Sequence, residues 1–578
     1  MKPVILSFTL VLIIRSSSGQ AVLDWVNKFD AAHNFLSEIA YDIISDEDNN
    51  IYITGFFDDS IDFDPGVGEE IYTFGEDQTS AFIAKYSSSG EFIWVIPIGS
   101  NSGQAQGSSI NFDEDGNIIC TGWVYQTVDF DPSPTMHNVS ATGGAISLYV
   151  AKYDSDGNYI FAFAVGGNYS TEGKSILSDA DNNILVIGNF CNAVDFDPSP
   201  ATTILTANNF TGDLFFAKYT EDGNFIFAKQ INATPTFENF DHGDFVESDE
   251  EGNIYLASMF SEQLDADPGP GITELTSVSY RNVFFAKYTA DMELIWAKKL
   301  VGEEESLIQC HALTLDDDNN IYLAGWYREI IDMDPTEGEY FLETTVENAS
   351  DDIYYGKYSE NGDLIWAKTI GGDGYDYARC IKVRSDGLIY ISGDFYKKVD
   401  FDPGTGVAFL EDTEDAEDGF ICVYDNNGNY LNASQIKGNL FNETYIYNME
   451  LDNNNDIYIT GCFSQTADFD CTDEESFLET YGGYDIFLAK YDTVIYTPNV
   501  AVLDVDKETI NIFPNPASHV LHLNSSNPDF SISELQIFTV DGKCLLQSSG
   551  VSELNISSLP AGLYFIRILD AFYQFEKI

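Results

Sequence analysis

Short runs of alternating apolar and polar residues, each ended by a tight turn, dominate the chain. Ile51 and Ile53 alternate with Tyr52 and Thr54, and a period of two is that of a β-strand rather than a helix. Asp-Gly and Asn-Gly pairs end many of these runs, because glycine tolerates positive φ and Asp or Asn bonds its own backbone. No sustained 3.6-residue period interrupts residues 23–491. The pattern predicts an all-β fold.

Two markers recur seven times along the chain with one common period. The first is an Asp-x-Asp-Pro motif that begins at Asp62 and returns every 66 to 70 residues, its last copy ending in Cys471 instead of Pro. The second, usually Ala-Lys-Tyr, ends at Tyr86 in its first copy. Four strand signals fill the second repeat, at residues 109–112, 117–123, 148–153 and 159–165. Four short antiparallel strands per repeat predict the blades of a β-propeller.

Seven copies predict a seven-bladed propeller over residues 20–496. An open solenoid is the alternative, but it would need atypical polar caps at both ends, and the sequence has none. The fourth strand carries an aromatic residue in the first five repeats, Asn432 stands there in the sixth, and the seventh repeat ends after Tyr491 without a fourth strand. Residues 23–28, which include Trp25, precede the first repeat and match that missing strand. We expect them to close the ring beside the last blade, although each blade could instead begin with its own Trp strand.

Charge limits what the protein binds. The chain has 26 Lys and Arg against 95 Asp and Glu, a formal net charge of −69. Such a field repels phosphate backbones and anionic head groups, which argues against nucleic-acid and lipid-surface binding. With 44% hydrophobic and 14% aromatic residues, the chain is not a disordered acidic tail. We therefore expect the Asp and Glu side chains to lie on the surface of a folded protein.

The N-terminus predicts a signal peptide over residues 1–19. Lys2 precedes an apolar stretch from Val4 to Ile14, and small residues follow as far as Gly19, as in export signals. The stretch is shorter than the ~20 residues that a spanning helix needs. We therefore expect no membrane span.

A different all-β unit follows the repeats. We place a linker at residues 497–508 and a small domain at 509–578. The domain has an Asp-Gly hairpin at Asp541 and a Pro-Ala-Gly turn at 560–562 before an alternating strand. These features predict a small Ig-like β-sandwich.

The repeats resemble a known family. Residues 50–55 (Asn-Ile-Tyr-Ile-Thr-Gly), 62–66 (Asp-Phe-Asp-Pro-Gly) and 82–86 (Phe-Ile-Ala-Lys-Tyr) resemble the SBBP-type propeller repeats of secreted bacterial proteins. The resemblance covers about residues 23–491. It implies the propeller and no single activity.

The C-terminal unit resembles the type A sorting domain of type IX secretion substrates from Bacteroidetes. The motifs that carry this resemblance begin at Ile512, Val540 and Ile556. It implies passage through the periplasm, recognition of residues 509–578 by the type IX translocon and sortase, and removal of this domain at the cell surface. The protein would be secreted or displayed on the outer-membrane surface of a Gram-negative bacterium. An ordinary β-sandwich binding module is the alternative.

The repeated aspartates are the candidate metal ligands. Paired carboxylates with one residue between them are hard oxygen ligands suited to calcium. When the first strand of each blade is innermost, all seven pairs share one face with the glycine pairs that end the fourth strands. The candidate ligands are Asp62, Asp64, Asp129, Asp131, Asp195, Asp197, Asp265, Asp267, Asp332, Asp334, Asp400, Asp402, Asp468 and Asp470. We favour the alternative, a structural latch in which Asp before Pro builds a turn and a recurring lysine such as Lys85 neutralises one Asp.

The sequence contains no catalytic constellation. The six histidines form no HExxH or other metal pair, and GxSxG, phosphate-loop and dinucleotide motifs are absent. We therefore predict a non-enzymatic binding or adhesion protein whose ligand is an extracellular protein or a glycan, with calcium as the one candidate cofactor. A carbohydrate-active glycoside hydrolase or lyase is the alternative, and its best candidate residues are the unrepeated polar ones. These are Arg281, His311, Arg328, Arg379 and Arg384.

The eight cysteines show no CxxC pair and no metal-finger spacing. We expect most of them to be unpaired. Cys310 and Cys380 occupy equivalent places in neighbouring repeats, so a disulfide between those two blades stays open.

Overall fold

A computed structural model of the protein describes most of the repeat region and parts of the C-terminal unit. The described residues are 21–29, 37–75, 78–207, 212–233, 245–279, 281–346, 350–412, 416–438, 443–472, 474–492, 510–513, 520–525, 535–539, 544–548, 553–556, 559, 562–568 and 571–577. Residues Gln20–Val494 form one compact unit, and Ile495–Ile578 belong to a second. The predicted signal peptide, residues 1–19, and the linker, 497–508, lie outside the described residues.

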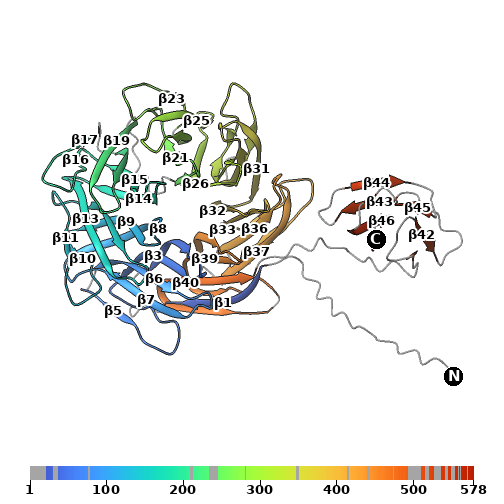
Figure 1. Ribbon diagram of the computed structural model, residues 1–578, viewed down its shortest axis with the longest axis horizontal. Helices are drawn as coiled ribbons and strands as arrows, with labels where there is room; N and C mark the ends of the chain where they lie inside the picture. The colour runs from blue at the N-terminus through green and yellow to red at the C-terminus, as the bar shows by residue number, and fades with distance from the viewer. Residues whose placement is uncertain are drawn as a thin grey trace. The chain divides into compact units, whose positions relative to one another are not determined.

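The described elements are all β-strands, which confirms the all-β prediction. In the first unit they form a propeller-like ring of antiparallel sheets around a central axis (Figure 1). The first strands, which lie nearest the axis, are β2 (Ile39–Ser45), β8 (Gln104–Phe112), β14 (Thr171–Ser178), β20 (Phe245–Ser248), β26 (Leu307–Leu315), β32 (Asp376–Val383) and β38 (Thr444–Leu451). The second strands are β3 (Ile51–Asp58), β9 (Ile118–Tyr125), β15 (Ile184–Phe190), β21 (Ile254–Phe260), β27 (Ile321–Arg328), β33 (Ile389–Tyr396) and β39 (Ile457–Asp468).

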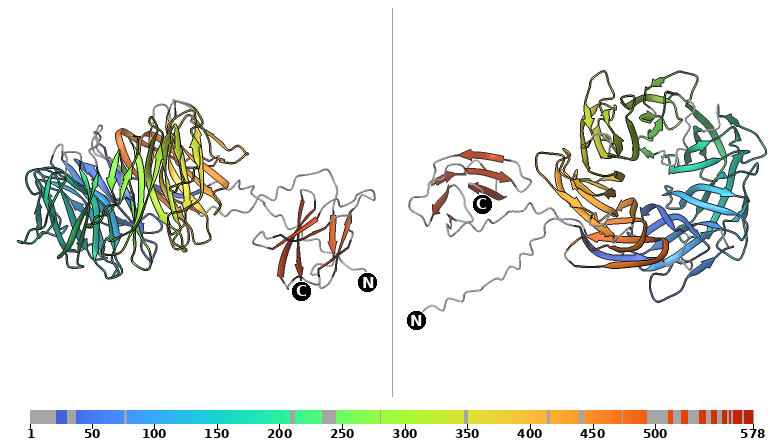
Figure 2. Two further views of the ribbon diagram at one scale, coloured as in Figure 1. Left: turned by 90° about the horizontal axis from the view of Figure 1, so that it is seen from above. Right: turned by 180° about the vertical axis from the view of Figure 1, so that it is seen from behind.

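Two further strands complete each repeat. The third strands are β6 (Thr79–Tyr86), β12 (Ser147–Tyr153), β18 (Asp213–Tyr219), β24 (Asn282–Tyr288), β30 (Asp352–Tyr358), β36 (Glu417–Tyr424) and β40 (Phe477–Asp492). The fourth strands are β7 (Phe92–Ile98), β13 (Tyr159–Gly167), β19 (Phe225–Ala233), β25 (Leu294–Gly302), β31 (Leu364–Gly372), β37 (Tyr430–Gly438) and β1 (Val22–Lys28). The edge-on view in Figure 2 shows the long strands crossing the thickness of this unit, so its loops gather on two faces.

Short outer hairpins carry the Asp-x-Asp motifs. They are β4–β5 (Ser60–Asp62, Ile71–Thr73), β10–β11 (Thr127–Asp129, Asn138–Ser140), β16–β17 (Ala193–Asp195, Ile204–Thr206), β22–β23 (Gln263–Asp265, Glu274–Thr276), β28–β29 (Ile330–Asp332, Phe341–Glu343) and β34–β35 (Lys398–Asp400, Phe409–Glu411). In the last repeat the long strands β39 and β40 contain the hairpin themselves. In the chain, each motif therefore directly follows a second strand or, in the last repeat, begins at its last residue.

Five repeats form separate sheets, whereas the last two share one. The sheet β2-β3-β6-β7 has four strands, and the sheets of repeats two to five have six, because each adds the outer hairpin of the following repeat. Strands of repeats six and seven join in one eight-stranded sheet, since Lys437 and Gly438 of β37 pair with Asp468 and Ala467 of β39. The prediction of seven separate blades is corrected accordingly. The physical reason is that β39 runs unbroken from its blade into the outer hairpin.

The N-terminal strand completes the last repeat, as predicted. β1 pairs antiparallel with β40, from Val22 opposite Asp492 to Lys28 opposite Phe487. Trp25 lies opposite Lys490, as Trp94 of β7 lies opposite Lys85 of β6. In Figure 1 the blue β1 runs beside the orange β40. The strand therefore covers the edge that β40 would otherwise expose.

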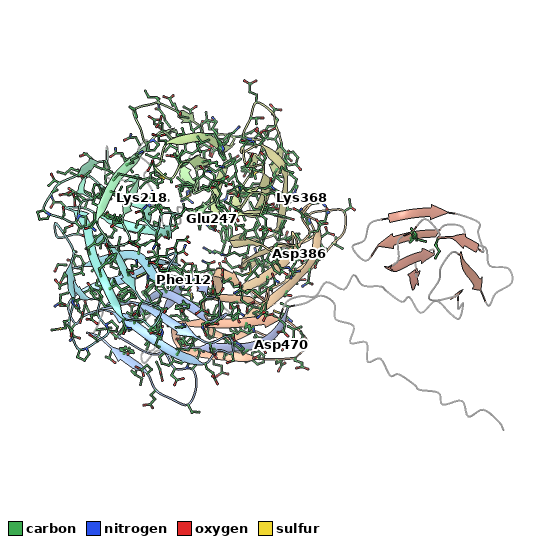
Figure 3. The ribbon with its side chains drawn as sticks, viewed as in Figure 1. Phe112, Lys218, Glu247, Lys368, Asp386 and Asp470 are labelled. Carbon is green, nitrogen blue, oxygen red and sulfur yellow. The ribbon has the colours of Figure 1, made fainter. Side chains whose placement is uncertain are left out.

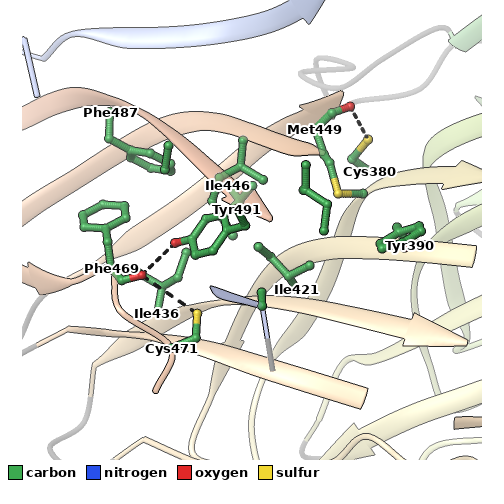
Figure 4. Packing of buried hydrophobic residues seen from close by; sticks show 14 of the residues in the cluster. Cys380, Tyr390, Ile421, Ile436, Ile446, Met449, Phe469, Cys471, Phe487 and Tyr491 are labelled. Atoms are coloured by element: carbon green, nitrogen blue, oxygen red, sulfur yellow. Dashed lines mark hydrogen bonds between the residues drawn. The ribbon is translucent and has the colours of Figure 1, made fainter. Parts of the chain in front are cut away.

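The core lies between neighbouring sheets. Seven clusters of buried apolar residues each draw on two adjacent repeats, and one of them joins the last repeat to the first. Figure 4 shows the cluster between repeats six and seven. Because both faces of the inner strands are covered, segments such as Ile51–Asp58 are apolar at most positions and largely buried.

The two sequence markers meet in space. The Tyr86 hydroxyl donates a hydrogen bond of 3.0 Å to the carbonyl oxygen of Phe63, which lies between the two aspartates of its motif. The same bond joins Tyr153 to Phe130, Tyr219 to Phe196, Tyr288 to Ala266, Tyr358 to Met333, Tyr424 to Phe401 and Tyr491 to Phe469 (the last drawn in Figure 4). This bond explains why both markers keep one period.

The C-terminal unit consists of two small antiparallel sheets. One contains β41 (Ile510–Phe513), β42 (Val520–Ser525) and β45 (Glu553–Asn555). The other contains β43 (Leu535–Thr539), β44 (Cys544–Ser548), β46 (Gly562–Ile568) and β47 (Ala571–Lys577). Across the described part of the chain, no helix is long and apolar enough to cross a membrane.

Seven cysteines of the described residues are free thiols, and Cys310 and Cys380 are among them. The disulfide that the sequence left open between these two is not formed. The two side chains belong to different core clusters. Cys310 Sγ donates to the carbonyl of Ala312 (3.4 Å), and Cys380 Sγ donates to Oδ1 of Asn448 (3.2 Å).

Candidate functional site

The predicted aspartate pairs hold the turns of their own loops. Oδ1 of Asp62 accepts hydrogen bonds from the backbone N–H groups of Asp64 (3.0 Å) and Glu70 (2.8 Å), and Oδ1 of Asp64 accepts from the N–H of Gly66 (2.9 Å). In the other six motifs the first aspartate likewise accepts two hydrogen bonds from backbone N–H groups. These aspartates are Asp129, Asp195, Asp265, Asp332, Asp400 and Asp468. The second aspartate of each motif likewise accepts a hydrogen bond from the backbone N–H group two residues later. These aspartates are Asp131, Asp197, Asp267, Asp334, Asp402 and Asp470. This is the geometry that the latch interpretation predicts.

The outer hairpins also join adjacent repeats. Gly166 and Gly167 at the end of β13 pair with Asp195 and Val194 of the next repeat. A Cβ at Gly166 would lie 2.3 Å from the Ser147 hydroxyl, so this close approach needs glycine. Four other hairpins join their preceding repeats at equivalent places. Acid pairs and glycine pairs therefore share one face, as predicted.

Calcium binding by these loops stays a prediction. Among the described residues, no group of three or more His, Cys, Asp and Glu side chains is arranged to hold a metal ion. We expect EDTA to leave the melting temperature unchanged, because the latch is made of hydrogen bonds to backbone N–H groups and needs no cation. Differential scanning calorimetry with EDTA and with added calcium measures this. A melting temperature that falls in EDTA and is restored by calcium would instead support calcium sites.

The recurring lysine pairs with a different aspartate from the predicted one. Lys152 Nζ lies 2.6 Å from Oδ2 of Asp113, in the turn between the first and second strands. The equivalent pairs are Lys85–Asp46, Lys218–Asp179, Lys287–Asp249 and Lys357–Asp316. In the seventh repeat the turn aspartate is Asp452, and Lys490 instead pairs with Asp456 (2.9 Å), which stands where the second repeat has Asn117. In the sixth repeat Val423 replaces the lysine and Arg384 replaces the turn aspartate. Both partners change together, so the ion pair is a structural unit of the blade.

Unrepeated residues gather at the axis of the ring. A cavity of about 360 Å³ lies there, lined by the first strands of all seven repeats. In six of these strands a one-residue β-bulge interrupts the pairing with the second strand. The residues at the bulges are Tyr41, Ser108, Lys174, His311, Arg379 and Tyr447, and all six line the cavity. Because a bulge re-aims a side chain, each of these blades directs one variable residue to the axis.

The five unrepeated residues singled out in the sequence do not form one group. His311 and Arg379 line the cavity. Arg281 approaches the Trp326 ring (6.0 Å), Arg328 forms an ion pair with Asp351 (2.6 Å), and Arg384 pairs with Asp386. The sequence reasoning missed the other bulged residues. A sequence signal for them exists. The residue type five positions before the turn aspartate differs from repeat to repeat, whereas the strand and turn residues around it recur.

Arg379 is fixed by a carboxylate and by aromatic rings. Its Nε lies 2.7 Å from Oδ1 of Asp394. The guanidinium carbon lies 5.4 Å from the ring centre of Tyr377 and 5.8 Å from those of Tyr445 and Tyr447. Burial raises the pKa of Asp394, and Arg379 acts against that rise. The cation is therefore held rigidly at the cavity wall.

Further along the first strands, ionisable groups line the same cavity. Lys382 Nζ lies 3.1 Å from Oε2 of Glu450. The Asp42 carboxylate accepts from Nδ2 of Asn448 (2.7 Å) and from the backbone N–H groups of Ile43 and Ile110 (both 2.9 Å). Burial nevertheless raises the pKa of Asp42 to about 6. Burial also raises the pKa of Glu247 to about 7, although Lys382 opposes the shift. Figure 3 shows Glu247 beside the centre of the ring.

Residues 511–577 match the secretion system C-terminal sorting domain. This confirms the predicted sorting domain and indicates export to the cell surface or secretion, as in Bacteroidetes. The chain is also 25% identical over 368 residues to an uncharacterized WD repeat-containing protein of Acanthamoeba polyphaga mimivirus, with 55% of this chain and 26% of that protein covered. It thus spans about a quarter of that relative.

Two solved structures are similar at low identity. One is a protein of unknown function from Bacteroides caccae, with 11% identity, a TM-score of 0.28, and coverage of 60% of this chain and 88% of that one. The other is an extracellular domain assigned to a hybrid two component system of B. thetaiotaomicron, with 12% identity, a TM-score of 0.15, and coverage of 96% and 99%.

Proposed function

We propose that the protein is an exported binding module whose ligand occupies the central cavity of a seven-bladed propeller. The seven inter-repeat core clusters and the pairing of β1 with β40 support seven blades in a closed ring. The repeats are of the SBBP type, and the two C-terminal sheets pack as an Ig-like sandwich. The type IX translocon and sortase are the partners of residues 509–578.

One observation carries the binding role. Positions that build the blades recur around the ring, whereas the bulged positions at the axis hold two tyrosines, a serine, a lysine, a histidine and an arginine. If these positions only supported the fold, we would expect the same residue to recur in each blade, as the tyrosine of the second marker does. A cavity with a few converging polar groups is the usual form of a ligand site.

Blocking the cavity tests this role. Ser108→Trp places an indole at the axis and is expected to abolish binding, because it fills the cavity. Thr202→Trp, on an exposed outer loop, is the matched control and should bind as wild type. Binding is measured on a glycan array and on a panel of immobilised extracellular matrix proteins. Binding that survives Ser108→Trp, or no binding to either panel, would contradict the proposal.

A carbohydrate-active enzyme is the second candidate, and the cavity carboxyls favour it. Glu247, with a pKa raised to about 7, would be protonated often enough near neutral pH to act as a general acid in a cavity that Asp42 also lines. A hydrolysis screen with wild type and Glu247→Gln separates the two roles. Turnover that this one substitution abolishes would favour the enzyme, and absence of turnover in the wild type would favour the binding module.

A further inference from the structure

The central cavity has one aromatic wall. Tyr41 and Tyr447, contributed by the first and last repeats, lie side by side with ring centres 5.3 Å apart at an angle of 68°. Both are half-buried and line the cavity. Lys174 and His311, from repeats three and five, stand across the ring. The hydroxyls of Ser108 and neighbouring serines also line the cavity. One part of the cavity wall is therefore aromatic and another part is polar.

The charges of the cavity disfavour an ionic ligand. Each cation already has its own carboxylate, in the pairs Lys174–Glu172 (2.9 Å), Arg379–Asp394 (2.7 Å) and Lys382–Glu450 (3.1 Å). A ligand anion would compete with these carboxylates and approach against a net charge of −69. A ligand cation near Tyr447 would meet the guanidinium of Arg379, whose central carbon lies 5.8 Å from the centre of that ring. A neutral ligand meets neither barrier.

The cavity also limits the size of the ligand and its direction of entry. Its volume of about 360 Å³ is at the small end of the ~300–1,000 Å³ of ligand pockets. A second cavity of about 480 Å³ shares Asn111, Val246 and Glu247 with it. Because the first strands of all seven repeats surround it, a ligand enters along the axis of the ring. A cavity of this size that opens along the axis suits the end of a linear ligand rather than its middle.

We infer that the cavity binds the end of a neutral glycan chain, an inference that rests on the proposed binding function. A pyranose ring has an apolar face of C–H groups and a rim of hydroxyls. The apolar face would pack on Tyr41 and Tyr447, and the hydroxyls would bond to Ser108, Asn111 and Lys174. The Ser108 hydroxyl and the Asn111 amide can both donate and accept, and the Lys174 ammonium donates, so these groups match a rim of hydroxyls.

Glycan binding by tyrosine variants tests the inference. On an array of neutral and uronic-acid oligosaccharides, the wild type is expected to retain neutral oligosaccharides with accessible ends. Tyr41→Ala and Tyr447→Ala should each weaken the Kd of such a hit about tenfold in isothermal titration calorimetry, because each removes one aromatic contact. Phe341→Ala, an aromatic residue 51% exposed on an outer hairpin, is the control and should bind as wild type. Unchanged melting temperatures show that the variants fold.

The remaining outcomes separate this inference from the binding role. Binding of uronic-acid glycans alone, or of a matrix protein alone, that Ser108→Trp abolishes would overturn the neutral-glycan inference and leave the cavity as the binding site. Neutral-glycan binding that both tyrosine variants retain would also overturn it. Binding that Ser108→Trp leaves intact would overturn both proposals.

Discussion

Replacing Phe29 with alanine is expected to lower the free energy of unfolding by about 3–5 kcal/mol. Phe29 follows β1 and is fully buried. Its ring lies 5.2 Å from that of Tyr86 and 6.5 Å from that of Phe63, both in the first repeat. Its backbone N–H donates to the carbonyl of Ile486 in the last repeat (3.2 Å). The substitution therefore leaves a cavity where the two ends of the ring meet.

Urea unfolding followed by tryptophan fluorescence measures this effect. Val22→Ala is the matched control, because Val22 begins the strand that Phe29 follows but is 47% exposed, and it should change stability by less than about 0.5 kcal/mol. A loss below about 1 kcal/mol for Phe29→Ala would mean that the junction between the last and first repeats adds little to the stability of the ring.

Replacing Arg379 with methionine is expected to destabilise the protein by about 3–5 kcal/mol at neutral pH. Asp394 is only 1% exposed, and it would stay buried without its cation. The pKa of Asp394 is already raised by burial, and the loss of Arg379 raises it further. The folded state then binds the proton more tightly than the unfolded state does, so the variant regains stability as the pH falls toward this pKa.

Unfolding of wild type, Arg379→Met and Arg379→Met/Asp394→Asn at pH 5 and pH 8 checks this prediction. The stability difference between Arg379→Met and wild type should shrink at pH 5, and Asp394→Asn should restore part of it at pH 8. A single variant as stable as wild type at both pH values would show that Asp394 does not depend on Arg379.

Most of the ring could be predicted from the sequence, because its signals are local and repeated. The Asp62 and Tyr86 markers locate the outer hairpin and third strand of each repeat, and Trp25 identifies the strand that pairs with β40. The joining of the last two sheets could not be predicted. It depends on two residue pairs between β37 and β39, and no local pattern distinguishes them from their equivalents.

The central site was predicted only in part. His311 and Arg379 stand out in the sequence because they break the repeat, whereas Tyr41 and Ser108 resemble ordinary strand residues. A β-bulge has no strong sequence signature, so the direction of these side chains appears only in three dimensions. The partner of the recurring lysine was wrong for a similar reason. The turn that carries Asp46 approaches Lys85 through the sheet, between segments far apart in the chain.

The position of β40 between two strands determines how the ring would resist a pulling force applied at the C-terminal end of β40. β40 is the strand from which the chain leaves toward the C-terminal unit, and it is flanked by β39 on one side and β1 on the other. When the protein is held at its C-terminal end and loaded through its ligand, extraction of this strand must break two ladders of hydrogen bonds at once. Without β1, the pulled strand would lie at an edge and resist with one ladder. A segment from the start of the chain would thus reinforce the strand that such a force pulls.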